Sequence, residues 1–356
     1  MMRNESKTNS AVRQRTDNKK LTIAGVEIAP GERKKIDIPV AKLYTDAEIS
    51  LPIQVIRAKK PGPVVFVSAA VHGDELNGIE IISRLAQQNL KLQSGTLILV
   101  PMVNVYGVLN QSRYMPDRRD LNRCFPGSKT GSLAGRLAYT FLNSVVAHCD
   151  YGIDLHTGAI HRSNLPQIRA NLDDAETKRL AEAFAVPVLL NANIRDGSLR
   201  GAAVGNDTRV LLYEAGEALR FDELSIQTGV KGVIRVLRAL GMIRKRMSKV
   251  NIEPFVANRS DWTRANASGF VKEFVSLGSV VEKNEILAEI NGPLGHSINQ
   301  VVSNRSGIII GKQNIPLVQE GEAMYHIAYF GDTAEEVHEH IEMMQDSIVS
   351  IGPDIS

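Results

Sequence analysis

Apolar, β-branched runs alternate with helical periodicity through much of this 356-residue chain. The run Val64–Ala70 is followed by Asn77–Gln88, where apolar residues recur with helical spacing, and then by a second apolar run at Thr96–Val103. Three further helical stretches and three further strands continue the pattern, in the order Leu133–His148, Tyr151–Leu155, Asp173–Ala185, Val186–Ala192, Arg209–Tyr213 and Glu223–Leu240. Strands that alternate with helices favour a mostly parallel sheet covered on both faces. We therefore predict a doubly wound α/β fold.

The segments on either side of this core have a different character. Before it we expect short strands broken by turns, at Lys20–Ile28, Lys35–Val40 and Ile49–Arg57. After it, alternating runs are separated by Gly, Asn and Pro, at Gly269–Val275, Val280–Val281, Ile286–Ile290, Gly307–Ile310 and Tyr325–Ala328. We predict a disordered basic tail (1–20), an α/β domain with N-terminal β hairpins (21–248), a smaller all-β, barrel-sandwich-like domain (249–332) and a C-terminal helix and tail (333–356), with the helix at Thr333–Met344.

Composition and charge narrow the class of protein. An apolar share of 43% and a charged share of 23% are typical of a soluble globular protein. The net charge of the chain is +3, and the first twenty residues, with six basic and two acidic side chains, contribute +4. The remaining residues therefore carry a net charge of −1, which argues against a nucleic-acid-binding face. The sequence has no apolar stretch long enough to predict a membrane span. The two cysteines, Cys124 and Cys149, form no disulfide framework, and we expect a cytoplasmic protein.

Three potential metal ligands stand at the ends of predicted strands. His72 and Glu75 follow the first apolar run, and His156 follows Tyr151–Leu155. A His and a Glu three residues apart at the start of a helix lie on one face, so both can reach one ion. Each residue alone is more often a hydrogen-bonded buried group, but the ends of parallel strands meet at one edge of a sheet. Two histidines and a carboxylate are a ligand set of catalytic zinc, and we predict one Zn²⁺ per chain.

A candidate proton carrier stands at the end of another strand. Glu214 directly follows Arg209–Tyr213, and a carboxylate at a buried strand end is costly unless it is paired or functional. A hydrolase needs a group that takes a proton from water and gives it to the leaving amine. Glu214 is therefore our candidate, whereas Glu217 lies beyond the turn and is expected to be solvated.

The segment Asn104–Lys129 interrupts the alternation and is too long for an ordinary connection. Loops of that length are usually functional or disordered. It contains Arg113 and Arg123, and an arginine fork suits a carboxylate because it donates two parallel hydrogen bonds. We expect the remaining charges of this loop to pair with one another or with solvent: Asp117, Arg118, Arg119 and Asp120.

Four ordered motifs resemble the succinylglutamate desuccinylase/aspartoacylase family, a branch of the zinc carboxypeptidase-like hydrolases. They are His72–Glu75, Arg113 with Asp120–Arg123 and Phe125–Gly127, Asp154–Gly158, and Glu214–Gly216. The resemblance implies a doubly wound zinc domain followed by a β domain at the substrate entrance. It also implies a zinc-dependent amidohydrolase, acting on carbon–nitrogen bonds of linear amides, that converts an N-acyl amino acid or related small amide to a carboxylate and a free amine.

The same resemblance implies a role for each matched residue. His72, Glu75 and His156 would bind zinc, Glu214 would be the general base and acid, and Arg113 would stabilise the oxyanion. Asn122 and Arg123 would hold a substrate carboxylate. Asp154 precedes His156 by two residues on the same side of the strand, where it can orient that histidine.

The sequence leaves the substrate and two rival functions open. The additional substrate-binding Arg and Tyr of aspartate-specific members have no aligned counterpart, although Arg162, Arg169 and Tyr325 are possible stand-ins. A zinc carboxypeptidase acting on short peptides and a non-catalytic protein that binds an amino-acid derivative are the alternatives. The expected partner is a small molecule, with no nucleic acid and no membrane, and the sequence leaves a homo-oligomer open.

Overall fold

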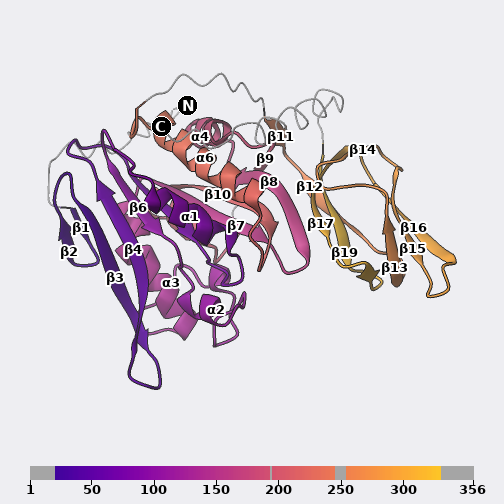
Figure 1. The fold of residues 1–356 in the computed structure, drawn as a ribbon, viewed down its shortest axis with the longest axis horizontal. Helices are drawn as coiled ribbons and strands as arrows, with labels where there is room; N and C mark the ends of the chain where they lie inside the picture. The colour runs from indigo at the N-terminus through magenta and orange to yellow at the C-terminus, as the bar shows by residue number, and fades with distance from the viewer. Residues whose placement is uncertain (1–20, 193–194, 245–253, 330–356) are drawn as a thin grey trace, which may run out of the picture.

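A mixed sheet of thirteen strands runs through the computed structural model, which describes residues 21–192, 195–244 and 254–329. Its main path has the order β12-β19-β17-β8-β10-β7-β5-β6-β4-β3 (Figure 1). The four central strands are parallel: β6 (Thr96–Val100), β5 (Val64–Ala69), β7 (Tyr151–Gly158) and β10 (Arg209–Glu217). The predicted α/β class with a mostly parallel central sheet is confirmed.

Helices cover both faces of these parallel strands (Figure 1). One face carries α1 (Asn77–Gln87), α4 (Ala175–Phe184) and α6 (Glu223–Ala239), which share an apolar core with the sheet. The other face carries α3 (Leu133–Ser144) and α5 (Leu199–Val204). The apolar spacing explains the packing, since the predicted stripe on α1 is the side that is buried. Shorter helical turns are α2 (Val105–Leu109), η1 (Leu121–Arg123) and η2 (Val146–His148).

Antiparallel strands extend the sheet on both sides of the parallel core. Strands β3 (Arg33–Lys42) and β4 (Glu48–Arg57) form a hairpin, which joins the sheet because β4 pairs with β6. A small separate hairpin is formed by β1 (Leu21–Ile23) and β2 (Val26–Ile28). On the other side, β8 (Arg162–Ala170) is antiparallel to β10, and β9 (Val188–Asn191) pairs with β8.

The C-terminal part is built from short strands, as expected. The strands β11 (Phe255–Ala257), β12 (Ser260–Arg264), β14 (Val280–Val281), β17 (Gly307–Gln313) and β19 (Ala323–Tyr329) join the main sheet. A second sheet has the order β16 (Ser297–Val302), β15 (Ile286–Asn291), β13 (Gly269–Glu273) and β18 (Leu317–Val318). Because β17 pairs directly with β8, this part of the chain is hydrogen-bonded to the strands that carry the site described below.

Several expectations about individual elements were wrong or incomplete. Lys20–Ile28 is not one strand, because the chain turns at Ala24 and Gly25, which have φ of 50° and 78°. Strand β8 and helix α5 were not predicted, since β8 contains Pro166 and several polar residues and α5 is short. The predicted tail at 1–20 and helix at Thr333–Met344 lie outside the described residues. Within the described residues, no helix is both long and apolar enough to cross a membrane.

Candidate active site

The side chains of His72, Glu75 and His156 converge where β5 and β7 end. Glu75 Oε1 lies 2.7 Å from His72 Nδ1, and Glu75 Oε2 lies 2.7 Å from His156 Nδ1. One potential ligand atom from each residue lies within 4.8 Å of the others, and all three side chains are buried. Two imidazole nitrogens and a carboxylate this close together suit a single divalent ion such as zinc.

His72 and Glu75 lie on a turn and not on a helix, so that part of the spacing argument was wrong. Helix α1 begins only at Asn77, and the Glu75 amide donates to the His72 carbonyl at 3.2 Å. Gly73 allows this turn to approach α2, because a Cβ there would lie 1.9 Å from the carbonyl carbon of Gly107. The tight turn brings the same two side chains together by a different route.

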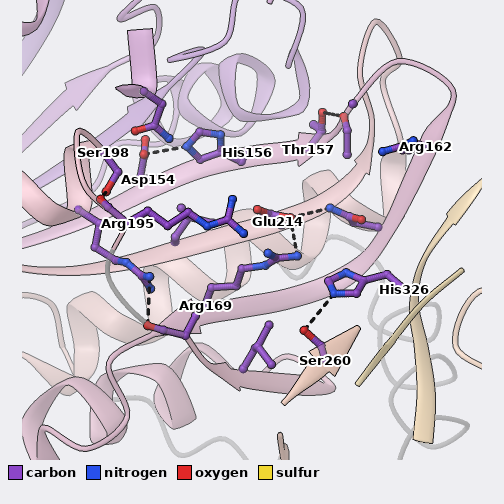
Figure 2. Close-up of a pocket in the computed structure, with 18 of the residues that line it drawn as sticks. Asp154, His156, Thr157, Arg162, Arg169, Arg195, Ser198, Glu214, Ser260 and His326 are labelled. Atoms are coloured by element: carbon purple, nitrogen blue, oxygen red, sulfur yellow. Dashed lines mark hydrogen bonds and ion pairs between the residues drawn. The ribbon is translucent and has the colours of Figure 1, made fainter. Parts of the chain in front are cut away.

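A carboxylate holds the outer nitrogen of each histidine. His156 Nε2 lies 2.8 Å from Asp154 Oδ2, as Figure 2 shows, and this is the contact expected for Asp154. His72 Nε2 lies 3.2 Å from Asp120 Oδ1. Such outer partners favour the tautomer in which Nδ1 of each ring can bind a metal. Asp120 had been expected to pair with neighbouring loop charges or with solvent, so its contact with His72 was not predicted from the sequence.

The electrostatic environment of these groups favours a positive charge between them. Burial opposes protonation of His156, but the charges of Asp154 and Glu75 outweigh it and raise its pKa well above the ordinary value. The pKa of His72 is raised as well, since Glu75 and Asp120 outweigh its burial. Burial alone would raise the pKa of Glu75, yet the two histidines lower it. A bound cation would supply the positive charge that the protonated histidines otherwise provide.

The long loop brings Arg113 to the edge of this cluster. Arg113 Nη2 lies 3.1 Å from Asp120 Oδ2, and Nη1 lies 3.4 Å from Glu75 Oε1. Asp120 also accepts the Asn122 amide at 2.8 Å, which begins η1 and fixes the loop locally. Burial would lower the pKa of Arg113, but Glu75 and Asp120 raise it, so its guanidinium is a fixed cation beside the candidate ligands.

Asn122 and Arg123 line the same cavity, although part of Asn122 is used by the fold. Its Oδ1 accepts the Leu199 amide at 2.9 Å, where helix α5 begins. Arg123 donates to the Asn122 carbonyl at 2.7 Å. Within the described residues, the side-chain amide nitrogen of Asn122 and the other guanidinium nitrogens of Arg123 make no hydrogen bond, so they are left for a ligand.

Glu214 also faces the cavity, from strand β10. Its Oε2 accepts Asn164 Nδ2 at 2.6 Å and lies 3.2 Å from an Arg169 nitrogen, and both partners come from β8 (Figure 2). Glu217, expected to be solvated, instead accepts the His161 amide at 3.0 Å and Asn314 Nδ2 at 2.8 Å, because β8 and the C-terminal strands cover that end of β10.

Every residue predicted for the site lines one cavity of about 690 Å³. Its lining includes eight arginines but only four carboxylates, and two of those four are Glu75 and Asp154. Arg162 and Arg169 are among the arginines, whereas Tyr325 does not line the cavity; it is buried in the C-terminal core, with its hydroxyl 3.4 Å from Glu273. Burial, reinforced by Arg169 and Arg195, lowers the pKa of His326 to about 3.

Several lining residues were not predicted from the sequence, among them Asn164, Arg195, Arg200 and His326. Asn164 belongs to the unpredicted strand β8 and Arg200 to the unpredicted helix α5. His326 lies on β19, more than 100 residues beyond Glu214 in the sequence. A signal for the arginines was their number between 162 and 200, where the sequence contains five.

Known proteins are similar to this chain in sequence and in fold. The protein is 25% identical to N-alpha-acetyl-L-2,4-diaminobutyric acid deacetylase of Halomonas elongata over 79% of this chain and 86% of that protein. It is 32% identical to succinylglutamate desuccinylase of Pseudomonas aeruginosa, over 41% of this chain and 46% of that enzyme. The product-bound ectoine utilization protein EutE (DoeB) from Ruegeria pomeroyi superposes with a TM-score of 0.74 at 22% identity, over 84% of this chain and 95% of that one.

The region that matches a family model contains the metal-ligand candidates, the long loop and Glu214. Residues 61–240 match the succinylglutamate desuccinylase/aspartoacylase catalytic domain. Two of these relatives are named as a deacetylase and a desuccinylase, enzymes that remove acyl groups, so the coarse class of reaction agrees with the site. On these grounds the chain belongs to the succinylglutamate desuccinylase/aspartoacylase family.

Proposed function

We propose that this protein is a zinc-dependent deacylase that hydrolyses the amide bond of a small N-acyl amino acid. The observation that carries the proposal is the presence, in one cavity, of the His72–Glu75–His156 cluster and the carboxylate of Glu214. The first group suits zinc, and the second can move a proton. Neither a simple binding protein nor a structural domain needs both.

The chain's own residues would divide the work as follows. A zinc ion held by His72, Glu75 and His156 would supply Lewis acidity, which polarises a carbonyl and lets water lose a proton near neutral pH. Glu214 would take that proton and return it to the leaving nitrogen. Arg113, a fixed cation beside Glu75, would stabilise the negative charge that develops on the carbonyl oxygen.

The charge of the cavity supports an acidic substrate. Apart from Glu75 and Asp154, which contact the histidines of the candidate metal cluster, its carboxylates are Glu214 and Asp261, against eight arginines. Arginine forks bind carboxylates in a bidentate manner, so Asn122 and Arg123 can hold one carboxylate while other arginines hold a second. The same surroundings disfavour a substrate with a free amino group, such as the compound named for the Halomonas relative.

Amine release from a panel of N-acyl amino acids tests this proposal. The panel contains N-succinyl, N-acetyl and N-formyl derivatives of glutamate and aspartate, together with N-acetyl-diaminobutyrate and a dipeptide. The protein is assayed as purified, after chelation, and after reloading with zinc. We expect metal-dependent release, fastest from the acidic amides; preferred release from the dipeptide would instead favour a carboxypeptidase.

A binding protein would give a different result. Zinc-loaded protein that binds the acidic amides in calorimetry, but releases no amine from any of them, would favour the non-catalytic alternative. Failure to bind zinc at all would contradict the proposal at its first step.

A further inference from the structure

Strand β8, which was not predicted, brings the buried side-chain amide of Asn164 into hydrogen-bonding contact with Glu214. Asn164 has an exposed fraction of 7%, and its Nδ2 donates to Glu214 Oε2 at 2.6 Å. Arg169, further along β8, lies 3.2 Å from the same oxygen. Within the described residues, Oε1 of Glu214 has no hydrogen-bond partner. The carboxylate is therefore held by one oxygen, while its other oxygen is free in the cavity.

Asn164 and Arg169 differ in how firmly they can hold that oxygen. Asn164 has a short side chain with two torsions and is buried, whereas the longer side chain of Arg169 is 18% exposed. A short buried side chain has fewer rotamers to choose from, so it fixes direction better than a long one. Arg169 supplies charge, and Asn164 supplies orientation.

A glycine on a C-terminal strand leaves room for the side chain of Asn164. Gly311 of β17 is the register partner of Asn164 in the antiparallel pair of β17 and β8. A Cβ on Gly311 would lie 2.8 Å from Asn164 Oδ1 and 3.2 Å from the Cβ of His326. Any side chain at Gly311 would therefore push the amide of Asn164 away from its present place.

We propose that Asn164 is a positioning residue that orients Glu214, and that Gly311 of β17 leaves the space that the Asn164 amide needs in order to do so. This rests on the proposed function, in which Glu214 carries the proton. Because Oε2 accepts the Asn164 amide, Oε1 takes the proton from water as the water oxygen bonds to the carbonyl carbon of the substrate. The same proton then passes from Oε1 to the amide nitrogen as the carbon–nitrogen bond breaks, and Glu214 returns to its ionised form.

Steady-state kinetics of Asn164→Ala and Gly311→Ala test the proposal on the full-length, zinc-loaded protein. Misplacing a reacting group by about 1 Å can cost about 10²-fold in rate. We therefore expect kcat to fall by about 10²-fold in Asn164→Ala, and by a smaller factor in Gly311→Ala, with KM and zinc content unchanged. Asn164→Gln should not restore kcat, because its amide is displaced by one methylene group.

Asn314→Ala is the matched control. Asn314 lies at the same junction of β8 and the C-terminal part, where Nδ2 donates to Ser163 Oγ at 2.7 Å and to Glu217 Oε2 at 2.8 Å, and it does not contact Glu214. We expect its kcat to match the wild type. An equal loss of kcat in Asn314→Ala would show that the junction acts through stability alone, and kcat within twofold of the wild type in Asn164→Ala would overturn the proposal.

A crystal structure of Asn164→Ala separates this inference from the proposed function. If the wild type hydrolyses none of the amides, the proposed function fails, but the Glu214 carboxylate should still turn away from its wild-type position in the variant. An unchanged Glu214 in that structure would overturn the positioning role whatever the activity.

Discussion

Ser68 and Asp154 lie opposite each other on the neighbouring strands β5 and β7, and Ser68 Oγ donates to Asp154 Oδ1 at 2.7 Å. The other oxygen of Asp154 lies 2.8 Å from His156 Nε2. The serine therefore fixes the carboxylate that fixes the histidine. Both contacts are buried, so the orientation of His156 is set by the sheet and not by solvent.

Substitution Asp154→Asn should weaken metal binding without unfolding the protein. The amide has nearly the same shape as the carboxylate but lacks its charge, so it no longer favours the tautomer in which Nδ1 of His156 can bind a metal. Loss of such an outer partner typically costs about 10- to 100-fold in metal affinity. Competition with a chromogenic chelator measures the change, and Ser68→Ala should give a smaller one. Equal zinc affinity in Asp154→Asn and the wild type would contradict this role.

Substitution Glu214→Gln should abolish turnover and leave zinc in place. Glutamine keeps the hydrogen-bonding shape but cannot carry the proton, and loss of a general base costs about 10²- to 10⁴-fold. Amine release and zinc content are measured on the same sample. Glu217→Gln is the control, since Glu217 binds a backbone amide and Asn314 and does not contact Glu214. Near wild-type turnover in Glu214→Gln would mean that another group is the base.

The sequence predicted the parts of the fold that depend on local periodicity. The helix at Asn77–Gln88 and the apolar strands beside it have strong periods, and the structure places them within a few residues of their predicted bounds. Strand β8 could not be predicted, because its polar residues fit a strand only once β10 and β17 lie on either side of it.

The candidate site residues that follow strands could be predicted from the sequence, whereas the contact that depends on the fold of the long loop could not. His72, Glu75, His156 and Glu214 all follow apolar runs, and they meet in one cavity because parallel strands end together. Asp120 is different, since its role depends on how the loop folds onto His72. Arginines such as Arg195 and Arg200 gather only through tertiary structure, so no spacing in the sequence revealed them as a group.

Substitution Arg113→Lys should lower kcat while zinc stays bound. Arg113 spans Glu75 and Asp120 with two nitrogens, and the single ammonium group of lysine cannot reproduce that fork. Removing one group that stabilises an oxyanion costs about 10²- to 10³-fold in kcat, and we expect a loss of that order. Arg119→Lys is the matched control in the same loop, because Arg119 is 61% exposed and lies 3.9 Å from its only ion-pair partner in the described residues, Asp117. Similar kinetics for the two variants would argue against a role for Arg113 in the reaction.

The last prediction concerns stability and pH, at a carboxylate remote from the candidate metal cluster. Asp174 is the N-cap residue of helix α4, and its Oδ2 accepts hydrogen bonds from the Thr177 amide at 2.9 Å and from Arg209 Nε at 2.8 Å. The hydrogen bond from Arg209 is the largest influence and outweighs burial, so the pKa of Asp174 is lowered to about 2. An aspartate in an unfolded chain has a pKa of about 3.9. Because the folded value is the lower one, the stabilisation is complete above about pH 4 and is lost as the pH falls toward 2.

Substitution Asp174→Ala should therefore lower the free energy of unfolding by about 1 kcal/mol at pH 7, the usual cost of losing a helix cap. Urea unfolding of the wild type and the variant at pH 7 and pH 3 measures the difference, which should be smaller at pH 3. Glu182→Ala is the control on the same helix, since Glu182 is 46% exposed and lies 4.0 Å from Lys178, so the free energy of unfolding should change by less than about 0.5 kcal/mol. A difference between wild type and Asp174→Ala that is the same at both pH values would show that the cap acts without its charge, because only the ion pair with Arg209 requires an ionised carboxylate.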